Sequence, residues 1–190
     1  MHEKLLNELV EILHSEQDNI DLDDQIERFL SLKKAYLESL GSFELLRELI
    51  SELNYRKRSS YKSSELIGFK ARIGDICYID FGKAYINEAG FQHFGLIIGQ
   101  SNSKALVLPM SSNLSMYNQS YCQDDFPVGK KHLFRLPMVP GLKRKSVLFL
   151  NDLKYINTAR IISIKGNIHP KSPLFKAVIR RVETLLHHNY

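Results

Sequence analysis

A histidine stands where a loop leads into an apolar run, in the stretch GFQHFGLIIG at residues 90–99. The Leu-Ile-Ile sequence after it is typical of a buried strand. The imidazole of His93 is suited to proton transfer, because its unperturbed pKa of about 6.5 lets it accept and donate protons near neutrality. A histidine at the start of a strand is also common as a surface or packing residue. Two interpretations of this position are therefore open.

The other residues that commonly bind metals or act as nucleophiles form no clear pattern. Cys77 and Cys122 are too few for a disulfide framework or a metal site, and we expect both to be reduced. The pair His187 and His188 has no third ligand in the sequence. These residues therefore predict no metal site. The N-terminus MHEKLLNELVEILH mixes charged and apolar residues, and no apolar run approaches the ~20 residues of a membrane span, so we expect a cytoplasmic protein without a membrane partner.

The charge of the chain is divided unequally between its two parts. Residues 1–60 carry 13 acidic and 8 basic side chains, whereas residues 61–190 carry 8 acidic and 18 basic ones. The second part is therefore expected to attract polyanions. Its central cations alternate with aromatic residues, a combination that can hold the phosphates and bases of a single strand, although a charge run can also be merely solvated. These residues are Tyr117, Tyr121, Phe126, Lys130, Lys131, Phe134, Arg135, Lys143, Arg144 and Lys145.

The first part of the chain has the pattern of helices. Apolar residues at helical spacing predict helices over residues 5–13, about 23–40 and 42–53. A polar, basic stretch follows them and is the best candidate for a linker. We therefore expect a helical extension over residues 1–58 and a linker over residues 59–71.

From about residue 73 the apolar period changes to that of strands. Several short strands separated by turns favour a small β-barrel over residues 72–190, so the expected fold class is α+β. A long polar insertion over residues 111–131 interrupts the strands. The expected strands are IGDICYIDF, FGLIIGQ, ALVLPM, HLFRLP, KSVLFLN and ARIISIKGNI, and PLFKAVIRRVETLL is expected to form a closing helix.

Four stretches, in the same order, resemble the PemK/MazF family of toxin endoribonucleases. They are RIGDICYIDFG, similar to an opening "RGDI" strand; GFQHFGLIIGQ, similar to "G-x-x-R-P-x-L-V-I"; ALVLPMSS, similar to a strand that ends in a small hydroxyl residue; and SVLFLNDLKYINTARI, similar to a late strand followed by "R-T-I-D-x-x-R". The resemblance covers about residues 72–186. It implies an SH3-like β-barrel with a C-terminal helix, cleavage of single-stranded RNA without a cofactor, a homodimer, and a cognate antitoxin protein as partner.

The resemblance also implies which residues act. The family's catalytic arginine falls on His93 and its catalytic threonine on Ser111. RNA cleavage by its own 2′-hydroxyl needs a base, a donor to the phosphoryl oxygens and an acid for the departing 5′-oxygen. We therefore expect His93 to carry the proton and Ser111 to donate a hydrogen bond to a phosphoryl oxygen.

We expect further site residues, some from these stretches and some from the charged residues beside them. The arginine of "R-T-I" falls on Lys154, which we expect to act as a catalytic charge partner, and the later arginine is retained as Arg160. The family's late acidic residue falls on Asn151, where capping of a turn is the alternative. Ser112 replaces Ser111 if the register shifts by one residue. The expected substrate-binding residues are Lys83, Gln92, Ser112, Arg135 and Asn151.

The expected function is therefore a metal-independent endoribonuclease of the toxin type, restrained by an antitoxin. The alternative is a barrel module that binds nucleic acid or protein without cleavage, since the family arginine is absent at position 93. A third interpretation, a purely structural interaction module, would not explain the excess of basic residues in the second part. The acidic extension could dock on the RNA-binding surface of its own chain, where the tether raises the effective concentration. It could equally extend the core, form a dimer or recruit the antitoxin.

Overall fold

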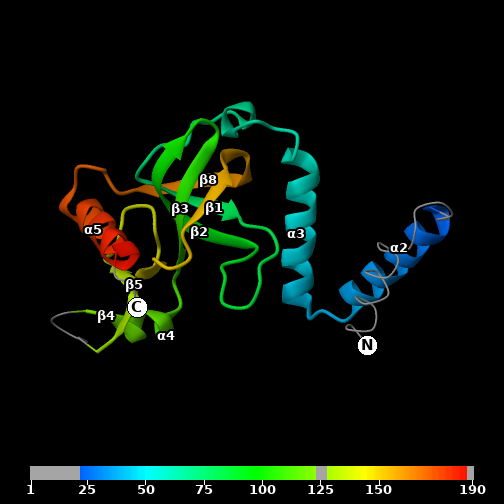
Figure 1. The fold of residues 1–190 in the computed structure, drawn as a ribbon, viewed down its shortest axis with the longest axis horizontal. Coiled ribbons are helices and arrows are strands. Elements are labelled where there is room, and N and C mark those ends of the chain that lie inside the picture. The colour runs from blue at the N-terminus through cyan, green and yellow to red at the C-terminus, as the bar shows by residue number, and fades with distance from the viewer. Residues whose placement is uncertain (1–21, 123–127, 188–190) are drawn as a thin grey trace. The chain divides into compact units, whose positions relative to one another are not determined.

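The structure is a computed structural model that describes residues 22–122 and 128–187 of the chain (Figure 1). The helix predicted over residues 5–13, Phe126 and His188 lie outside the described residues. None of the described helices is both long and apolar enough to span a lipid bilayer.

The chain divides into two compact units, Met1–Leu45 and Leu46–Tyr190. The described part of the first unit contains α2 (Leu22–Glu38) and the start of α3 (Ser42–Arg58). Both helices were predicted and are confirmed. The first turn of α2 is acidic, which favours the helix because carboxylates complement the positive end of its dipole. Apolar side chains of α2 are exposed, namely Leu22, Ile26, Phe29 and Leu30.

The second unit is built on an eight-stranded sheet, with hydrogen-bonded order β4-β5-β6-β3-β2-β1-β8 and with β7 paired to β3. The short β4 is parallel to β5, and the other pairings are antiparallel. The order begins at β4 and ends at β8, which are not paired with each other among the described residues, while the α+β class is confirmed. The strands are β1 (Asp75–Asp80), β2 (Gln92–Ser101), β3 (Lys104–Ser111), β4 (Ser120–Tyr121), β5 (Lys130–Leu136), β6 (Ser146–Phe149), β7 (Lys154–Asn157) and β8 (Ile161–Asn167).

The sheet has apolar packing on both of its faces, because successive side chains of a strand point to opposite sides. Leu96 of β2 belongs to one cluster and the adjacent Ile97 to the other, which explains the continuous apolar run in the sequence. The helix α5 (Pro173–His187), red in Figure 1, packs on the first cluster through Phe175, Val178 and Val182. The second cluster includes Ile79, Val107, Ile156 and Ile161.

Two segments differ from their sequence-based expectation. The polar insertion contains the short helix α4 (Leu114–Gln119), whose N-terminus is capped by the Oδ1 of Asn113. The predicted linker contains the 3-10 helix η2 (Ser64–Ile67), and the backbone N–H of Ser64 donates to Oγ1 of Thr158 at 3.0 Å. The two segments have only six and four residues, so an apolar period could not reveal them.

Candidate active site

The chain turns tightly before β2 and thereby fixes the ring of His93. The ring Nδ1 lies 2.7 Å from the carbonyl oxygen of Gly90. A carbonyl oxygen only accepts hydrogen bonds, so this contact assigns the proton to Nδ1 and leaves Nε2 as the acceptor nitrogen. The turn needs glycine at position 90, since a Cβ there would lie 2.7 Å from the Cβ of Ala84. The local sequence therefore positions an imidazole that can accept a proton at Nε2.

The surroundings of His93 lower its pKa below the usual value of 6.5. Burial is the largest cause, because a half-buried ring loses hydration in its charged form. The cations Arg47 and Lys154 lower the pKa further, whereas the Gly90 carbonyl and Asp152 raise it. At neutral pH the ring is consequently uncharged, which is the state that a general base requires.

Ser111 stands opposite His93 in the register of the sheet. The last pair between β2 and β3 is Phe94 with Met110, and the same register continued by one residue sets His93 opposite Ser111. Side chains of directly opposed residues share a face, with Cβ atoms about 4.5–5.5 Å apart. The Oγ of Ser111 accepts from the backbone N–H of Asn113 at 3.1 Å, so its own hydrogen is available to donate. The register thus sets an imidazole and a hydroxyl opposite each other, and the alternation of β3 continued by one residue sets Ser112 on the other side.

Arg135 extends this row across the sheet. Arg135 of β5 pairs with Val147 of β6, and Val147 pairs in turn with Ser111. Since neighbouring strands lie about 4.8 Å apart, the row from Arg135 to His93 spans roughly 14 Å. The Nε of Arg135 donates to Oγ of Ser120 at 2.7 Å, which holds the guanidinium in place. One face of the sheet therefore carries a base, a hydroxyl and a fixed cation in line.

Lys154 lies beside the same turn, and its ammonium group is bound to residues of the protein. Its Nζ donates to the carbonyl oxygen of Ala89 at 3.1 Å and lies 3.0 Å from Oδ1 of Asp152. The other carboxylate oxygen of Asp152 accepts from the backbone N–H of Ala89 at 2.7 Å. Asn151 is exposed in the preceding turn. The lysine and the aspartate therefore hold the loop that positions His93, and they supply the charges nearest to the turn.

Helix α3 is bonded to this face through polar groups. Arg47 Nη2 donates to the carbonyl oxygen of Gly90 at 3.1 Å and lies 3.5 Å from Nδ1 of His93. The amide of Gln92, predicted to bind substrate, is buried and donates to the carbonyl oxygen of Arg47 at 3.3 Å. Ser51 donates to a carboxylate oxygen of Asp80 at 2.9 Å. The helix thus places a guanidinium directly beside the candidate base.

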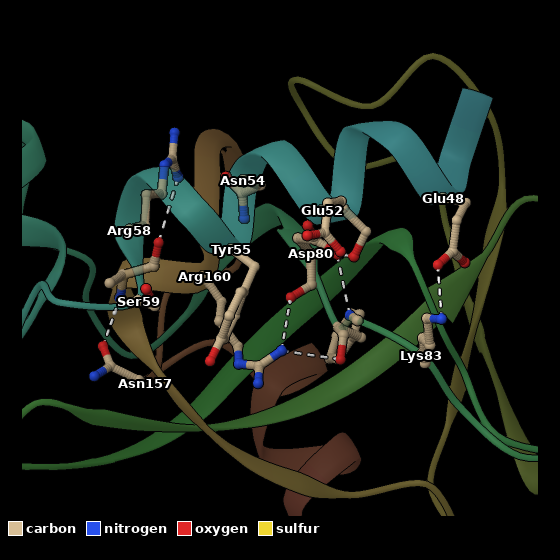
Figure 2. A pocket seen from close by; sticks show the side chains of 14 residues that line it. Glu48, Glu52, Asn54, Tyr55, Arg58, Ser59, Asp80, Lys83, Asn157 and Arg160 are labelled. Atoms are coloured by element: carbon tan, nitrogen blue, oxygen red, sulfur yellow. Dashed lines mark hydrogen bonds and ion pairs between the residues drawn. The ribbon is translucent and has the colours of Figure 1, made fainter. Parts of the chain in front are cut away.

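A second set of contacts surrounds a pocket between α3 and the sheet, shown in Figure 2. Lys83, another predicted substrate-binding residue, forms a 2.7 Å ion pair with Oε1 of the buried Glu48. Arg58 Nη1 donates to the carbonyl oxygen of Ile161 at 2.7 Å. Arg160, the arginine retained from the family motif, donates through Nη1 to the carbonyl oxygen of Phe81 at 3.0 Å. The basic residues of this region are held by backbone carbonyls and one carboxylate.

Sequence reasoning missed Arg47 and Glu48 as residues of this face. A signal was present, because Arg47, Glu48, Ser51, Tyr55 and Arg58 form a polar stripe at helical spacing. On the opposite side of the helix the apolar residues Leu46, Leu49, Ile50 and Leu53 are exposed. The usual rule that the apolar stripe of a helix faces its own sheet therefore does not hold for α3.

The thiol of Cys77 is not part of this chemistry. Burial, aided by the charge of Asp75, raises its pKa to about 12, so the thiol stays protonated at neutral pH and is a poor nucleophile. Within the parts of the chain that the structure describes, no group of three or more His, Cys, Asp or Glu side chains is arranged to hold a metal ion.

Several solved structures are similar to this chain. MazF from Deinococcus radiodurans has 12% identity over 63% of this chain and 99% of its own, with a TM-score of 0.46. The MazE–MazF structure from the same organism has 12% identity over 64% and 99%, with a TM-score of 0.43. An endoribonuclease in complex with its cognate antitoxin, from a mycobacterial species, has 9% identity over 64% and 99%, with a TM-score of 0.43. No family model and no curated protein matches the sequence.

Proposed function

We propose that the protein is a toxin-type endoribonuclease that cleaves single-stranded RNA without a metal ion. The observation that carries the proposal is the pairing of two groups on one sheet face. His93 keeps an acceptor nitrogen and is neutral at pH 7, and the register sets the hydroxyl of Ser111 opposite it. A base next to a hydrogen-bond donor is the minimum that attack by a 2′-hydroxyl on a neighbouring phosphate requires.

In the proposed reaction, Nε2 of His93 takes the proton of a 2′-hydroxyl. The 2′-oxygen then bonds to the adjacent phosphorus, and the bond from phosphorus to the 5′-oxygen of the next nucleotide breaks. Ser111 donates to a phosphoryl oxygen as negative charge grows there, and Lys154 adds a positive charge beside the turn. The proton held by His93 returns to the departing 5′-oxygen, so the ring is neutral again after one turnover. The products carry a 2′,3′-cyclic phosphate and a 5′-hydroxyl.

The wider biological setting belongs to the same proposal and rests on the sequence resemblance. It comprises an SH3-like closure of the sheet, a homodimer, a cytoplasmic location and a cognate antitoxin that restrains the enzyme. The proposed organisation has a helical extension over residues 1–58, a linker over 59–71 and the catalytic domain over 72–190. The excess of basic residues after residue 60 supports an acidic partner for this domain.

The test is cleavage of a long single-stranded RNA by the full-length protein in the presence of a metal chelator. We expect the native protein to produce fragments with 2′,3′-cyclic phosphate ends, and His93→Ala to produce none. His169→Ala is the matched control, because His169 is exposed and lies outside the row of His93 and Ser111. Equal cleavage by the native protein and His93→Ala would contradict the proposed mechanism.

A non-catalytic binding module is the second candidate, and one contact favours it. Arg47 lies 3.5 Å from the ring of His93 and so adds a cation where a phosphate could be bound without being cleaved. Tight RNA binding with intact RNA after prolonged incubation would support this candidate over the enzyme. Because phosphate contacts are salt-dependent, the binding should be measured at several salt concentrations.

A further inference from the structure

The pocket between α3 and the sheet is not used by the cleavage mechanism. Its volume is about 420 Å³, and its lining comes from α3, the end of β1 and η3 (Thr158–Arg160) (Figure 2). It lies close to the proposed catalytic face, because Glu48, which lines it, follows directly after the Arg47 that contacts His93. Because α3 forms one wall, the pocket is lined both by the N-terminal extension and by the sheet.

One end of the pocket has an unused hydrogen-bond acceptor. Glu48 is only 3% exposed, and its Oε1 is paired with Lys83. Its other carboxylate oxygen, Oε2, has no hydrogen-bond partner among the residues that the structure describes. A buried carboxylate oxygen without a donor is costly. This end of the pocket therefore suits a ligand group that donates a hydrogen bond.

The other end has an unused donor. Arg58 binds the Ile161 carbonyl through Nη1, but its buried Nε has no partner in the described part of the chain. Arg58 lies ten positions after Glu48 on the helix, which is roughly 15 Å along the axis, and Figure 2 shows them at opposite ends of the lining segment. Arg160 also lines the pocket and adds a second guanidinium. This region therefore suits an anionic ligand group that accepts hydrogen bonds.

An exposed aromatic ring lies between these two ends. Tyr55 lines the pocket and is 65% exposed, so its ring face is open to a flat partner. A nucleotide has the three groups in question: an amino group on adenine, cytosine or guanine, a planar base, and a phosphate. Unpaired bases commonly stack on tyrosine while carboxylates accept from their amino groups and arginines bind their phosphates.

We propose that this pocket binds an unpaired, amino-bearing base of RNA together with a neighbouring phosphate. Glu48 Oε2 accepts from the amino group, Tyr55 stacks on the base, and Arg58 and Arg160 bind the phosphate. The inference rests on the proposed ribonuclease function, since it assigns base selection at the same substrate face. It also makes the N-terminal extension part of the substrate site, because α3 supplies three of the four residues.

The test measures binding of uncleavable 2′-O-methyl oligocytidine and oligouridine to the full-length protein at one salt concentration. We expect tighter binding of oligocytidine by at least about fivefold, a preference that Glu48→Gln abolishes because the amide side chain can also donate to the uracil carbonyl. Tyr55→Ala is expected to weaken oligocytidine binding about tenfold, since stacking contributes strongly for each base, whereas Tyr55→Phe retains it. Tyr85→Ala is the matched control, because Tyr85 is exposed and does not line the pocket.

Competition with cytidine monophosphate separates a free nucleotide from an RNA strand as the ligand. Displacement by the mononucleotide at millimolar concentration, or only by a longer strand, supports the pocket in either case. Equal binding of both oligonucleotides, together with native affinity in Tyr55→Ala, would overturn it. RNA cleavage is scored separately. If the protein cleaves RNA but these variants have no effect on binding, only the proposal for the pocket is contradicted. If binding depends on the pocket but no RNA is cleaved, only the proposed ribonuclease function is contradicted.

Discussion

The helices α3 and α5 both contact the sheet of the second unit, but α5 does so with its apolar side and α3 with its polar side. Helix α5 buries Phe175, Val178 and Val182 against the apolar cluster of the sheet. Helix α3 buries Glu48 alone and leaves Leu46 and Leu53 more than half exposed. It is bonded to the sheet through polar groups, for example by the hydrogen bond from Ser51 to Asp80.

The different contacts of α3 and α5 indicate different roles for the two helices. Burial of apolar area is the main source of folding free energy, so α5 is a stabilising element of the domain. Polar contacts contribute less net free energy, because the same groups bind water in the unfolded chain. A helix that directs its charged side toward the sheet is therefore better explained by the site that it lines than by stability.

The largest expected effect is on stability and separates the two helices directly. Phe175→Ala is expected to lower the free energy of unfolding by about 3–5 kcal/mol, because it leaves a cavity under α5. Leu53→Ala on α3 removes an exposed side chain and is expected to change it by less than about 0.5 kcal/mol. Denaturant unfolding monitored by circular dichroism measures both. Equal losses for the two variants would mean that the exposed side of α3 is also part of the core.

The next effect concerns the row on the face of β2 and β3. Ser111→Ala is expected to slow RNA cleavage about 100-fold, because it removes a donor to the developing charge on the phosphate. Ser112→Ala should remain within about twofold of native, since the register places that exposed side chain on the other side. Single-turnover cleavage rates compare the two variants. The reverse order would mean that the register at the end of β3 is shifted by one residue.

The smallest effect is a pKa change caused by α3. A neighbouring cation disfavours the charged imidazole, so Arg47 contributes to the lowered pKa of His93. Arg47→Met should therefore raise that pKa, and the ring should stay protonated to higher pH than in the native protein. NMR titration of the histidine ring signals measures the change. Arg56→Met is the control, because Arg56 is exposed and pairs with Glu52. A pKa that falls or stays constant in Arg47→Met would show that α3 does not act on the ring.

The sequence predicted the elements that carry a strong apolar period. Helices α2, α3 and α5 and the long strands were found because their apolar residues repeat at helical or strand spacing. The strand β7 was missed, since it has four residues and only Ile156 among them is buried. The helix α4 was missed because its stability depends on the Asn113 cap and on none of the buried side chains that an apolar period detects.

The candidate site was predicted only where it depends on neighbouring strands. His93 and Ser111 were expected from the family resemblance, and they lie on two strands that are consecutive in the chain and paired in the sheet. The contact of Arg47 with His93 joins residues 46 positions apart through a helix that faces the sheet with its polar side. No local pattern specifies that pairing. The substrate-binding role expected for Gln92 took no account of this contact, in which the Gln92 amide donates to the Arg47 carbonyl.

The central claim is that neutral His93 is the base of RNA cleavage, and its titration tests this most directly. The account predicts that cleavage falls as pH decreases, with a midpoint that matches the pKa of the His93 ring measured by NMR and lies below 6.5. Burial lowers the pKa, so the neutral ring should persist into mildly acidic solution. A cleavage rate that stays constant while the NMR signals show His93 becoming protonated would contradict the account.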